Sequence, residues 1–251
     1  MINKIFNNKG CTKMITDKYL EFVMSKLKEV QETQSGNIEK AADLIVESCK
    51  KGGRFYVFGS GHSHMVAEEL YIRAGGLAYV KGILPPELML HEMPNKSTYL
   101  ERLDGYAKSI LDLYKVNKDD TIMVVSNSGR NNVPVEMCLY SKEIGASVIA
   151  LTSLKHSTQV ESRHKSGKNI YEIADVVIDN CAEKGDAAFY VEGFNIPTGP
   201  TSDATGIAIA QAIIVTVIDK LVKEGIDVPV FKSSNLDGAD EYNNELFNKY
   251  Y

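Results

Sequence analysis

The stretch RFYVFGSGHS at residues 54–63 decides the fold. Its first five residues are rich in aromatic and β-branched side chains, and a glycine stops the run at once. Such a short run is typical of a strand buried within a parallel sheet. Similar runs recur further along the chain, at residues 121–125 (TIMVV), 148–151 (VIAL) and 176–178 (VVI). Because helical stretches separate these runs, they predict βαβ units and a doubly wound α/β fold.

The rest of the chain divides around this pattern. Apolar residues recur at helical spacing from residue 15 to residue 51, and Gly36 marks an expected break, so this region predicts a pair of helices. A long helix is expected at residues 203–223, with Asp203 as its N-cap. The remaining expectations, in chain order, are a strand at 75–80 and irregular segments at 82–97 and 180–202.

We therefore predict one domain with a helical N-terminal arm. Residues 1–13 are polar and lack an apolar segment, which indicates a disordered leader. Residues 14–51 are the N-terminal helices of the same unit, and residues 52–251 form the α/β domain with a C-terminal tail.

Composition excludes several classes of protein. The chain has 251 residues, of which 44% are hydrophobic and 24% charged, as in ordinary globular proteins. Its net charge of -5 leaves no general basic surface for a nucleic acid. The four cysteines lie far apart, which fits neither a disulfide framework nor a zinc site. No export signal or membrane anchor is visible, so we expect a cytoplasmic protein without a nucleic-acid or membrane partner.

Polar loops follow three of the expected strands, beginning at Gly59, Ser126 and Thr152. Ligands bind outside the carboxyl ends of the strands in open α/β sheets, so these loops should meet at one crevice. Hydroxyls and backbone amides without lysine suit a phosphate monoester. A dinucleotide fingerprint is absent, because His64 stands where the third glycine belongs, and no triphosphate loop or nucleophile elbow occurs. The alternative is that the loops are ordinary strand-to-helix turns.

The motifs FGSGHS, VVSNSGRN, VIALTS and PTSDATGIAIAQAI, in this order, resemble the SIS (sugar isomerase) domain of phosphosugar isomerases and phosphosugar-binding proteins. The similarity spans nearly all of residues 38–246. It extends to a group of stand-alone bacterial SIS proteins, labelled phosphoheptose isomerase-like, that share GSGHSHM and a terminal NxDGxDxxN. The resemblance implies a flavodoxin-like, five-stranded parallel sheet flanked by helices and a homodimer or homotetramer with a site near the subunit interface.

The resemblance also implies a sugar-phosphate ligand. The implied phosphate contacts are Ser60, Ser63, Ser126, Ser128 and Asn131. The family motif S-x-S-G-x-T-x-E is altered here, since Asn131 replaces its threonine and Val133 its glutamate. Neighbouring positions that we also expect to bind the substrate are Gly61, His62, Asn127, Thr152 and Ser153.

Aldose–ketose interconversion needs a base that moves a proton between adjacent carbons. His91 is the first candidate, with Glu87, because its setting is similar to a histidine of arabinose 5-phosphate isomerases. The alternative is a loop histidine that packs a subunit interface. His64 and Glu68 are the second pair, since a spacing of four places them on one helix face, similar to a His and Glu of phosphoheptose isomerases.

Other polar residues leave alternatives open. His62, His64 and Glu68 could bind zinc, but no further ligand completes the set, so we expect no metal and no cofactor. Asn235 and Asp237 in the tail are expected either to bind sugar hydroxyls or to cap a terminal helix. The histidines in LKHSTQVESRHKSG, at positions 156 and 164, are expected on the surface without a role.

The sequence thus favours a phosphosugar-binding protein, and within that class an aldose–ketose isomerase that works by general acid–base proton transfer. Two alternatives stay open. One is a non-catalytic sugar-phosphate sensor or binding module. The other is a lyase or etherase that acts on a phosphorylated amino sugar.

Overall fold

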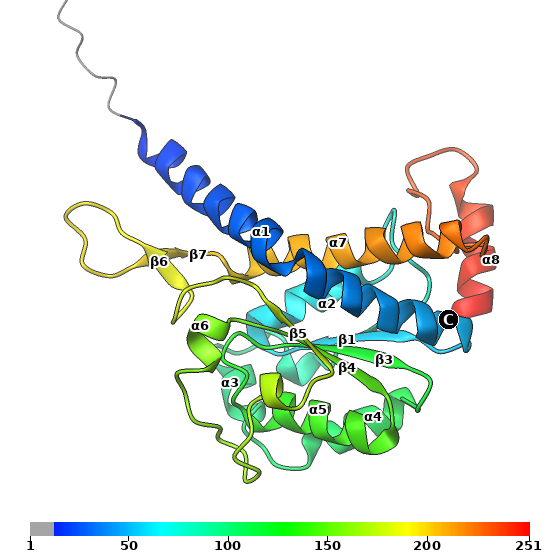
Figure 1. Ribbon diagram of the computed structural model, residues 1–251, viewed down its shortest axis with the longest axis horizontal. Coiled ribbons are helices and arrows are strands. Elements are labelled where there is room, and N and C mark those ends of the chain that lie inside the picture. The colour runs from blue at the N-terminus through cyan, green and yellow to red at the C-terminus, as the bar shows by residue number, and fades with distance from the viewer. Residues whose placement is uncertain (1–12) are drawn as a thin grey trace, which may run out of the picture.

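The computed structural model describes residues 13–251, and a five-stranded parallel sheet lies at its centre (Figure 1). The strand order is β2-β1-β3-β4-β5, the doubly wound order that the sequence predicts. All neighbouring strands run in the same direction. The strands are β1 (Phe55–Gly59), β2 (Val80–Ile83), β3 (Thr121–Val125), β4 (Ser147–Thr152) and β5 (Val176–Asp179).

Helices cover both faces of this sheet (Figure 1). The longer helices are α1 (Ile15–Lys50), α2 (His64–Leu70), α4 (Tyr106–Tyr114), α5 (Asn132–Ile144), α7 (Ser202–Lys223) and α8 (Ala239–Tyr250). The short helical turns are η1 (Gly61–Ser63), η2 (Pro86–Leu88), α3 (Lys96–Leu100), α6 (Leu154–Ser157) and η3 (Ile170–Glu172). An antiparallel pair of strands, β6 (Ala187–Phe189) and β7 (Thr198–Pro200), lies outside the main sheet.

Two hydrophobic clusters form because alternate strand residues point to opposite faces. In β1, Val57 packs in the cluster beneath α1, α2 and α7, whereas Phe58 packs in the cluster beneath α4 and α5. Both side chains are fully buried. Burial on both faces explains why the strands appear in the sequence as continuous apolar runs without polar alternation.

The N-terminal region is one helix, so the predicted break at Gly36 is wrong. Buried positions continue at spacings of three and four on both sides of this glycine, at Val30, Gln34, Ile38 and Ala41. A glycine costs a helix about 1 kcal/mol relative to alanine. Packing of the helix against α7 and the sheet outweighs that cost.

Three smaller expectations are also corrected. The strand expected at 75–80 begins only at Val80, because the preceding residues turn back and Leu77 pairs with Val230 instead. The irregular segment expected at 180–202 contains β6 and β7. Asp203 lies in the first turn of α7 and does not cap it. The backbone amides of Thr201 and Ser202 at this helix end donate instead to the Asp186 carboxylate, at 3.0 and 2.9 Å.

Among the described residues, α7 is the one helix long and apolar enough to cross a membrane by length and composition. In the fold it packs against α1, α2 and the sheet, and residues such as Ile213 and Val217 are fully buried there. It is a core helix, as its nearly uniform hydrophobicity predicts. Of the predicted leader at 1–13, residues 1–12 lie outside the described part of the chain.

Candidate functional site

The strand register brings the predicted polar loops to one edge of the sheet. Gly59 at the end of β1 pairs with Val125 at the end of β3, and Val125 pairs with Leu151 of β4. Ser60 and Ser126 therefore begin neighbouring loops at the same level. Gly59 is needed for the first loop to fold back, since a Cβ at this position would lie 2.1 Å from the Ser63 carbonyl oxygen.

The serine hydroxyls at this edge differ in their exposure and in whether they already form hydrogen bonds within the protein. The hydroxyl of Ser60 is buried without a hydrogen-bond partner of good geometry among the described residues, and Ser63 and Ser128 are partly exposed. The Ser126 hydroxyl accepts from the Gly129 amide at 3.2 Å, which closes its turn and leaves its own proton to donate. These four serines follow β1 and β3 at the same edge of the sheet.

Three other predicted contacts hold the loops together instead of facing the edge. The Thr152 hydroxyl donates to the Asn127 carbonyl at 3.2 Å, and the Asn127 side-chain oxygen accepts from Asn180 at 3.0 Å. The Ser153 hydroxyl donates to the Ala182 carbonyl at 2.6 Å and caps α6. Thr152 and Ser153 are fully buried, so neither hydroxyl is free to meet a ligand.

Glu101 joins the site from the end of α3, and sequence reasoning missed it. Asn131 bridges Glu101 to Arg163, donating to the Glu101 carboxylate and accepting from the Arg163 guanidinium at 2.7 Å. Burial raises the pKa of Glu101, and the nearby Ser60 hydroxyl, Arg102 and Arg163 oppose this shift. No motif marks Glu101 in the sequence, because only the packing of α3 against the sheet edge brings it there.

Positive charges gather beside these loops. Burial lowers the pKa of Arg163, and repulsion from Arg102 and Arg130 adds to the shift. Burial likewise lowers the pKa of His156, reinforced by Lys184 and Arg130. The Nδ1 atom of His156 is buried without a partner among the described residues, and His164 is only 7% exposed, so the expectation that both histidines are solvated on the surface is wrong. Repelling cations around a polar crevice favour an anionic ligand.

The two predicted catalytic histidines line one pocket beside Gly61 of the first loop. This small, open pocket has a cavity volume of about 20 Å³, and its lining residues are Gly61, His64, Met65, Glu68, Met89, Leu90 and His91. His64 is almost fully buried, and its Nδ1 lies 3.2 Å from the Gly59 carbonyl oxygen. That geometry suits an Nδ1–H donor and leaves Nε2 unprotonated, 3.7 Å from the Glu68 carboxylate.

The charge state of His64 follows from its surroundings. Burial lowers its pKa, and the attraction of the Glu68 carboxylate only partly opposes that shift. His64 is therefore neutral at neutral pH. His91 is exposed at the mouth of the pocket and can meet a ligand directly.

Other predicted site residues do not join this edge. Glu87 accepts from the Tyr106 hydroxyl at 3.2 Å and lines a different pocket, between Leu84 and Tyr114. Asn235 and Asp237 are exposed in the segment before α8, which lies at the far end of the sheet from α6, β6 and β7 (Figure 1). Within one chain these two residues are remote from the serine loops.

His62 is exposed beside the serine loops. Among residues 13–251, His62, His64 and Glu68 do not gather into a set of metal ligands. The one such group in this part of the chain is Asp104, Glu136 and His164.

The fold and the sheet-edge site define a doubly wound α/β protein with its polar loops placed for an anion. A family model of the SIS domain matches residues 18–153. The UPF0309 protein BH3325 of Halalkalibacterium halodurans is 60% identical over 239 residues, covering 95% of this chain and 98% of that protein. A UPF0309 protein of Geobacillus thermodenitrificans is 42% identical over 234 residues, covering 93% and 94%. The chain belongs to the SIS domain family.

Solved structures agree on the fold. The phosphoheptose isomerase of Neisseria gonorrhoeae superposes with a TM-score of 0.57 at 16% identity, covering 81% of this chain and 97% of that one. A phosphoheptose isomerase of Francisella tularensis gives a TM-score of 0.51 at 16% identity, covering 82% and 100%. The predicted family and the predicted fold class are confirmed.

Proposed function

We propose that this protein is a cytoplasmic enzyme that binds a sugar phosphate and interconverts its aldose and ketose forms. One observation carries the proposal: Gly61 belongs both to the serine-lined sheet edge and to the pocket of His64 and His91. A ligand whose phosphate is held by the loops would therefore place its sugar carbons against the histidines. The same fold in two phosphoheptose isomerases supports this reading.

The phosphate would be held by modest hydrogen bonds and by charge. Ser63 and Ser128 supply partly exposed hydroxyls, and the Ser126 hydroxyl has its own proton left to donate. Arg130 and Arg163 supply positive charge, which the sequence did not lead us to expect. Hydrogen bonds between charged and neutral groups each contribute about 1.5–3 kcal/mol, so several together would anchor the substrate firmly.

Proton transfer would fall to His91, which is exposed to the sugar. Its imidazole would take a proton from the carbon next to the carbonyl and return it to the former carbonyl carbon, so that only the positions of hydrogens change. Glu68 would assist the proton exchange between the sugar oxygens. His64, whose Nδ1–H donates to the Gly59 carbonyl, would form the buried wall of the pocket beside Glu68.

A second copy of the chain would complete the site. Pockets for small molecules usually enclose roughly 300–1,000 Å³, whereas the cavity volume of this one is about 20 Å³. At its mouth, Met65 and Leu90 are each 39% exposed, which leaves apolar surface for a partner to cover. We therefore propose a homodimer or homotetramer with the pocket at the subunit interface.

The deciding experiment follows deuterium uptake from D₂O into a panel of aldose and ketose phosphates, with the unphosphorylated sugars as a parallel arm. We expect exchange at the carbon next to the carbonyl for at least one phosphorylated sugar and none without phosphate. His91→Asn should reduce the exchange rate by at least 100-fold, within the range expected for removing a general base. Glu92→Gln, at an exposed neighbouring position outside the pocket, is the matched control.

Binding is measured alongside by calorimetry. A sugar phosphate that binds tightly but never exchanges would contradict the isomerase and favour the sensor. Failure to bind any phosphorylated sugar, with the fold intact by circular dichroism, would contradict the entire proposal.

A further inference from the structure

Glu101 lies between the two serine-bearing loops, the one after β1 and the one after β3. Ser97 of its helix α3 lies against the first loop, because a Cβ at Gly61 would be 3.6 Å from the Ser97 hydroxyl oxygen. The Glu101 carboxylate accepts from the side-chain amide of Asn131 in the second loop. We propose that the protein binds its anionic ligand together with one proton, which the Glu101 carboxylate takes up from the solvent.

Backbone hydrogen bonds hold Glu101 in this place. Its amide donates to the Ser97 carbonyl at 2.9 Å, and its carbonyl accepts from the Val133 amide at 2.9 Å. The first bond ties the residue to α3 and the second ties it to the first turn of α5. A shift of the main chain away from an arriving anion would break both bonds, so the carboxylate stays beside the loops.

Two negative charges at this place would repel each other. Like charges that share one partly buried site favour the protonated form of an acid, as in pairs of carboxylates that hold one proton between them. Burial already raises the pKa of Glu101, and the nearby Ser60 hydroxyl, Arg102 and Arg163 oppose that shift. An anion held by the loops would attract the same two arginines and repel the carboxylate. Protonation removes the repulsion, and the new O–H group can donate to the anion.

The groups that face Glu101 leave it as the site of protonation. Arg102 is on its own segment, and Arg163 is on the loop before η3. The loops after β1 and β3 contribute neutral groups, the Ser60 hydroxyl and the Asn131 amide. Arginine is already protonated near neutral pH, and a hydroxyl or an amide does not ionise there. Of these five side chains, Glu101 alone can take up a proton.

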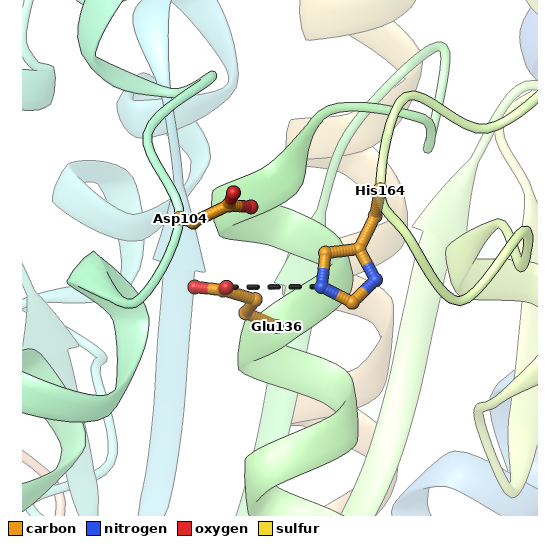
Figure 2. A group of neighbouring side chains, drawn as sticks. All are labelled: Asp104, Glu136 and His164. Carbon is orange, nitrogen blue, oxygen red and sulfur yellow. Dashed lines mark ion pairs between the residues drawn. The ribbon is translucent and has the colours of Figure 1, made fainter.

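A second group of ionisable side chains lies nearby and is bonded separately. It consists of Asp104, Glu136 and His164 (Figure 2). Both Glu136 oxygens accept from one backbone amide, at 2.8 and 2.9 Å. The His164 Nδ1 atom accepts from the Ser166 amide at 3.2 Å, which leaves the ring proton on Nε2. In the described part of the chain no hydrogen bond or ion pair joins this group to Glu101, so Asp104 offers a neighbouring carboxylate for comparison.

The pH should therefore control the affinity for the ligand. Because a proton enters with the anion, the affinity should rise as the pH falls, by at most about tenfold per pH unit for one proton. The full effect occurs between the pKa of Glu101 in the free protein and its higher pKa in the complex. This inference rests on the proposed phosphate site and adds that protonation regulates binding there.

The test uses sodium sulfate as the probe, because sulfate remains a dianion near neutral pH and cannot itself take up the proton. The purified full chain is titrated calorimetrically at pH 7 in buffers that differ in ionisation enthalpy, so that the slope of the observed enthalpy gives the number of protons. We expect about 0.5–1 proton taken up per bound sulfate. The infrared difference spectrum of the wild-type chain should gain the C=O band of a protonated carboxyl, which tests the acceptor without a substitution.

Glu101→Gln keeps an acceptor for the Asn131 amide and imitates the protonated carboxyl. It should bind sulfate without proton uptake, and its affinity should hardly change between about pH 6 and pH 8. The matched control is Asp104→Asn, which removes the neighbouring carboxylate and should keep the uptake. His62→Gln and His91→Asn remove the two exposed imidazoles beside the loops and should keep it too.

The outcomes separate this inference from the proposed function. Sulfate binding without proton uptake in the wild-type chain would overturn the inference alone. So would uptake that persists in Glu101→Gln, or uptake that disappears in His62→Gln or His91→Asn, since another group would then hold the proton. A chain that binds no sulfate would overturn the serine loops as an anion site and this inference with it. Failure of the isomerase shows instead in the deuterium exchange.

Discussion

Asn131 shows how a departure from a family motif can be read at the scale of one residue. It stands where the SIS motif has a threonine. Its longer side-chain amide has a separate donor and acceptor, so it can bridge two residues on opposite sides. It donates to Glu101 with one end and accepts from Arg163 with the other. Both groups of the amide are occupied, so Asn131 links Glu101 to Arg163 and is poorly placed to bind a phosphate itself.

His64 carries the clearest effect of pH at this scale. Burial lowers its folded-state pKa below the ordinary value of 6.5. The unfolded chain therefore binds a proton more readily than the folded chain as the pH falls through about 6.5. The stability linked to His64 is present above this pH and is lost on acidification.

We predict that wild-type stability decreases between pH 7.5 and 5.5 more steeply than that of His64→Gln. Urea unfolding at a series of pH values measures both slopes. His62→Gln, which changes an exposed histidine two residues away, should keep the wild-type slope. Parallel curves for wild type and His64→Gln would show that this imidazole does not contribute to the acid sensitivity.

At the scale of the element, α1 illustrates a conflict between local propensity and packing. The glycine at position 36 favours a break, whereas the apolar residues before and after it keep one continuous helical phase. Packing prevails because the C-terminal half of α1 buries Ala41, Ala42 and Ile45 against α7 and the sheet. Apolar periodicity that continues through a glycine is thus better evidence for one continuous helix than the glycine is for a break.

Gly36→Ala should raise the free energy of unfolding by about 0.5–1 kcal/mol, because alanine has less backbone freedom to lose in the unfolded chain. Gly36 is exposed and a Cβ there meets nothing within 4 Å, so no clash offsets the gain. Chemical denaturation provides the measurement. Gly52→Ala is the contrasting variant, since its φ of +78° disfavours alanine even though the space is equally open, and it should lower stability. A loss of stability in Gly36→Ala would mean that α1 bends at this residue in solution.

At the scale of the whole molecule, the N-terminal half of α1 projects beyond the sheet beside β6 and β7 (Figure 1). One side of this arm packs on the strand pair through Tyr19 and Phe189, whose ring centroids lie 5.4 Å apart. The other side leaves Leu20 and Met24 more than half exposed. An exposed apolar arm of this kind suits association with a second copy.

The protein should therefore elute as a dimer or tetramer in light-scattering chromatography at micromolar concentration. Leu20→Glu combined with Met24→Glu should shift it toward the monomer, because two charges would be buried unpaired at the interface. Leu113→Glu is the control: Leu113 is 79% exposed on α4, beneath the opposite face of the sheet. A monomeric wild-type chain would contradict both the oligomer and the shared pocket.

The sequence alone was enough to predict the fold and the polar loops at one edge of the sheet. Short apolar runs such as 54–58 and 121–125 indicate strands that are buried on both faces of a sheet. The rule that ligands meet the carboxyl ends of such strands predicted where the candidate site would lie. These patterns involve residues that are close together in the sequence, so they can be recognised in a single sequence. They also correctly indicated that the Ser60 and Ser126 loops would lie side by side.

The sequence could not predict which polar side chains are already hydrogen-bonded within the protein, because that depends on tertiary packing. Thr152 and Ser153 carry a hydroxyl, as Ser128 does, but they are buried and their hydroxyls donate to backbone carbonyls of neighbouring loops. Glu101, Arg163 and the Asp104–Glu136–His164 group come from segments far apart in the chain. They come into contact only because α3, α5 and the loop before η3 pack together, and no spacing in the sequence predicts that packing.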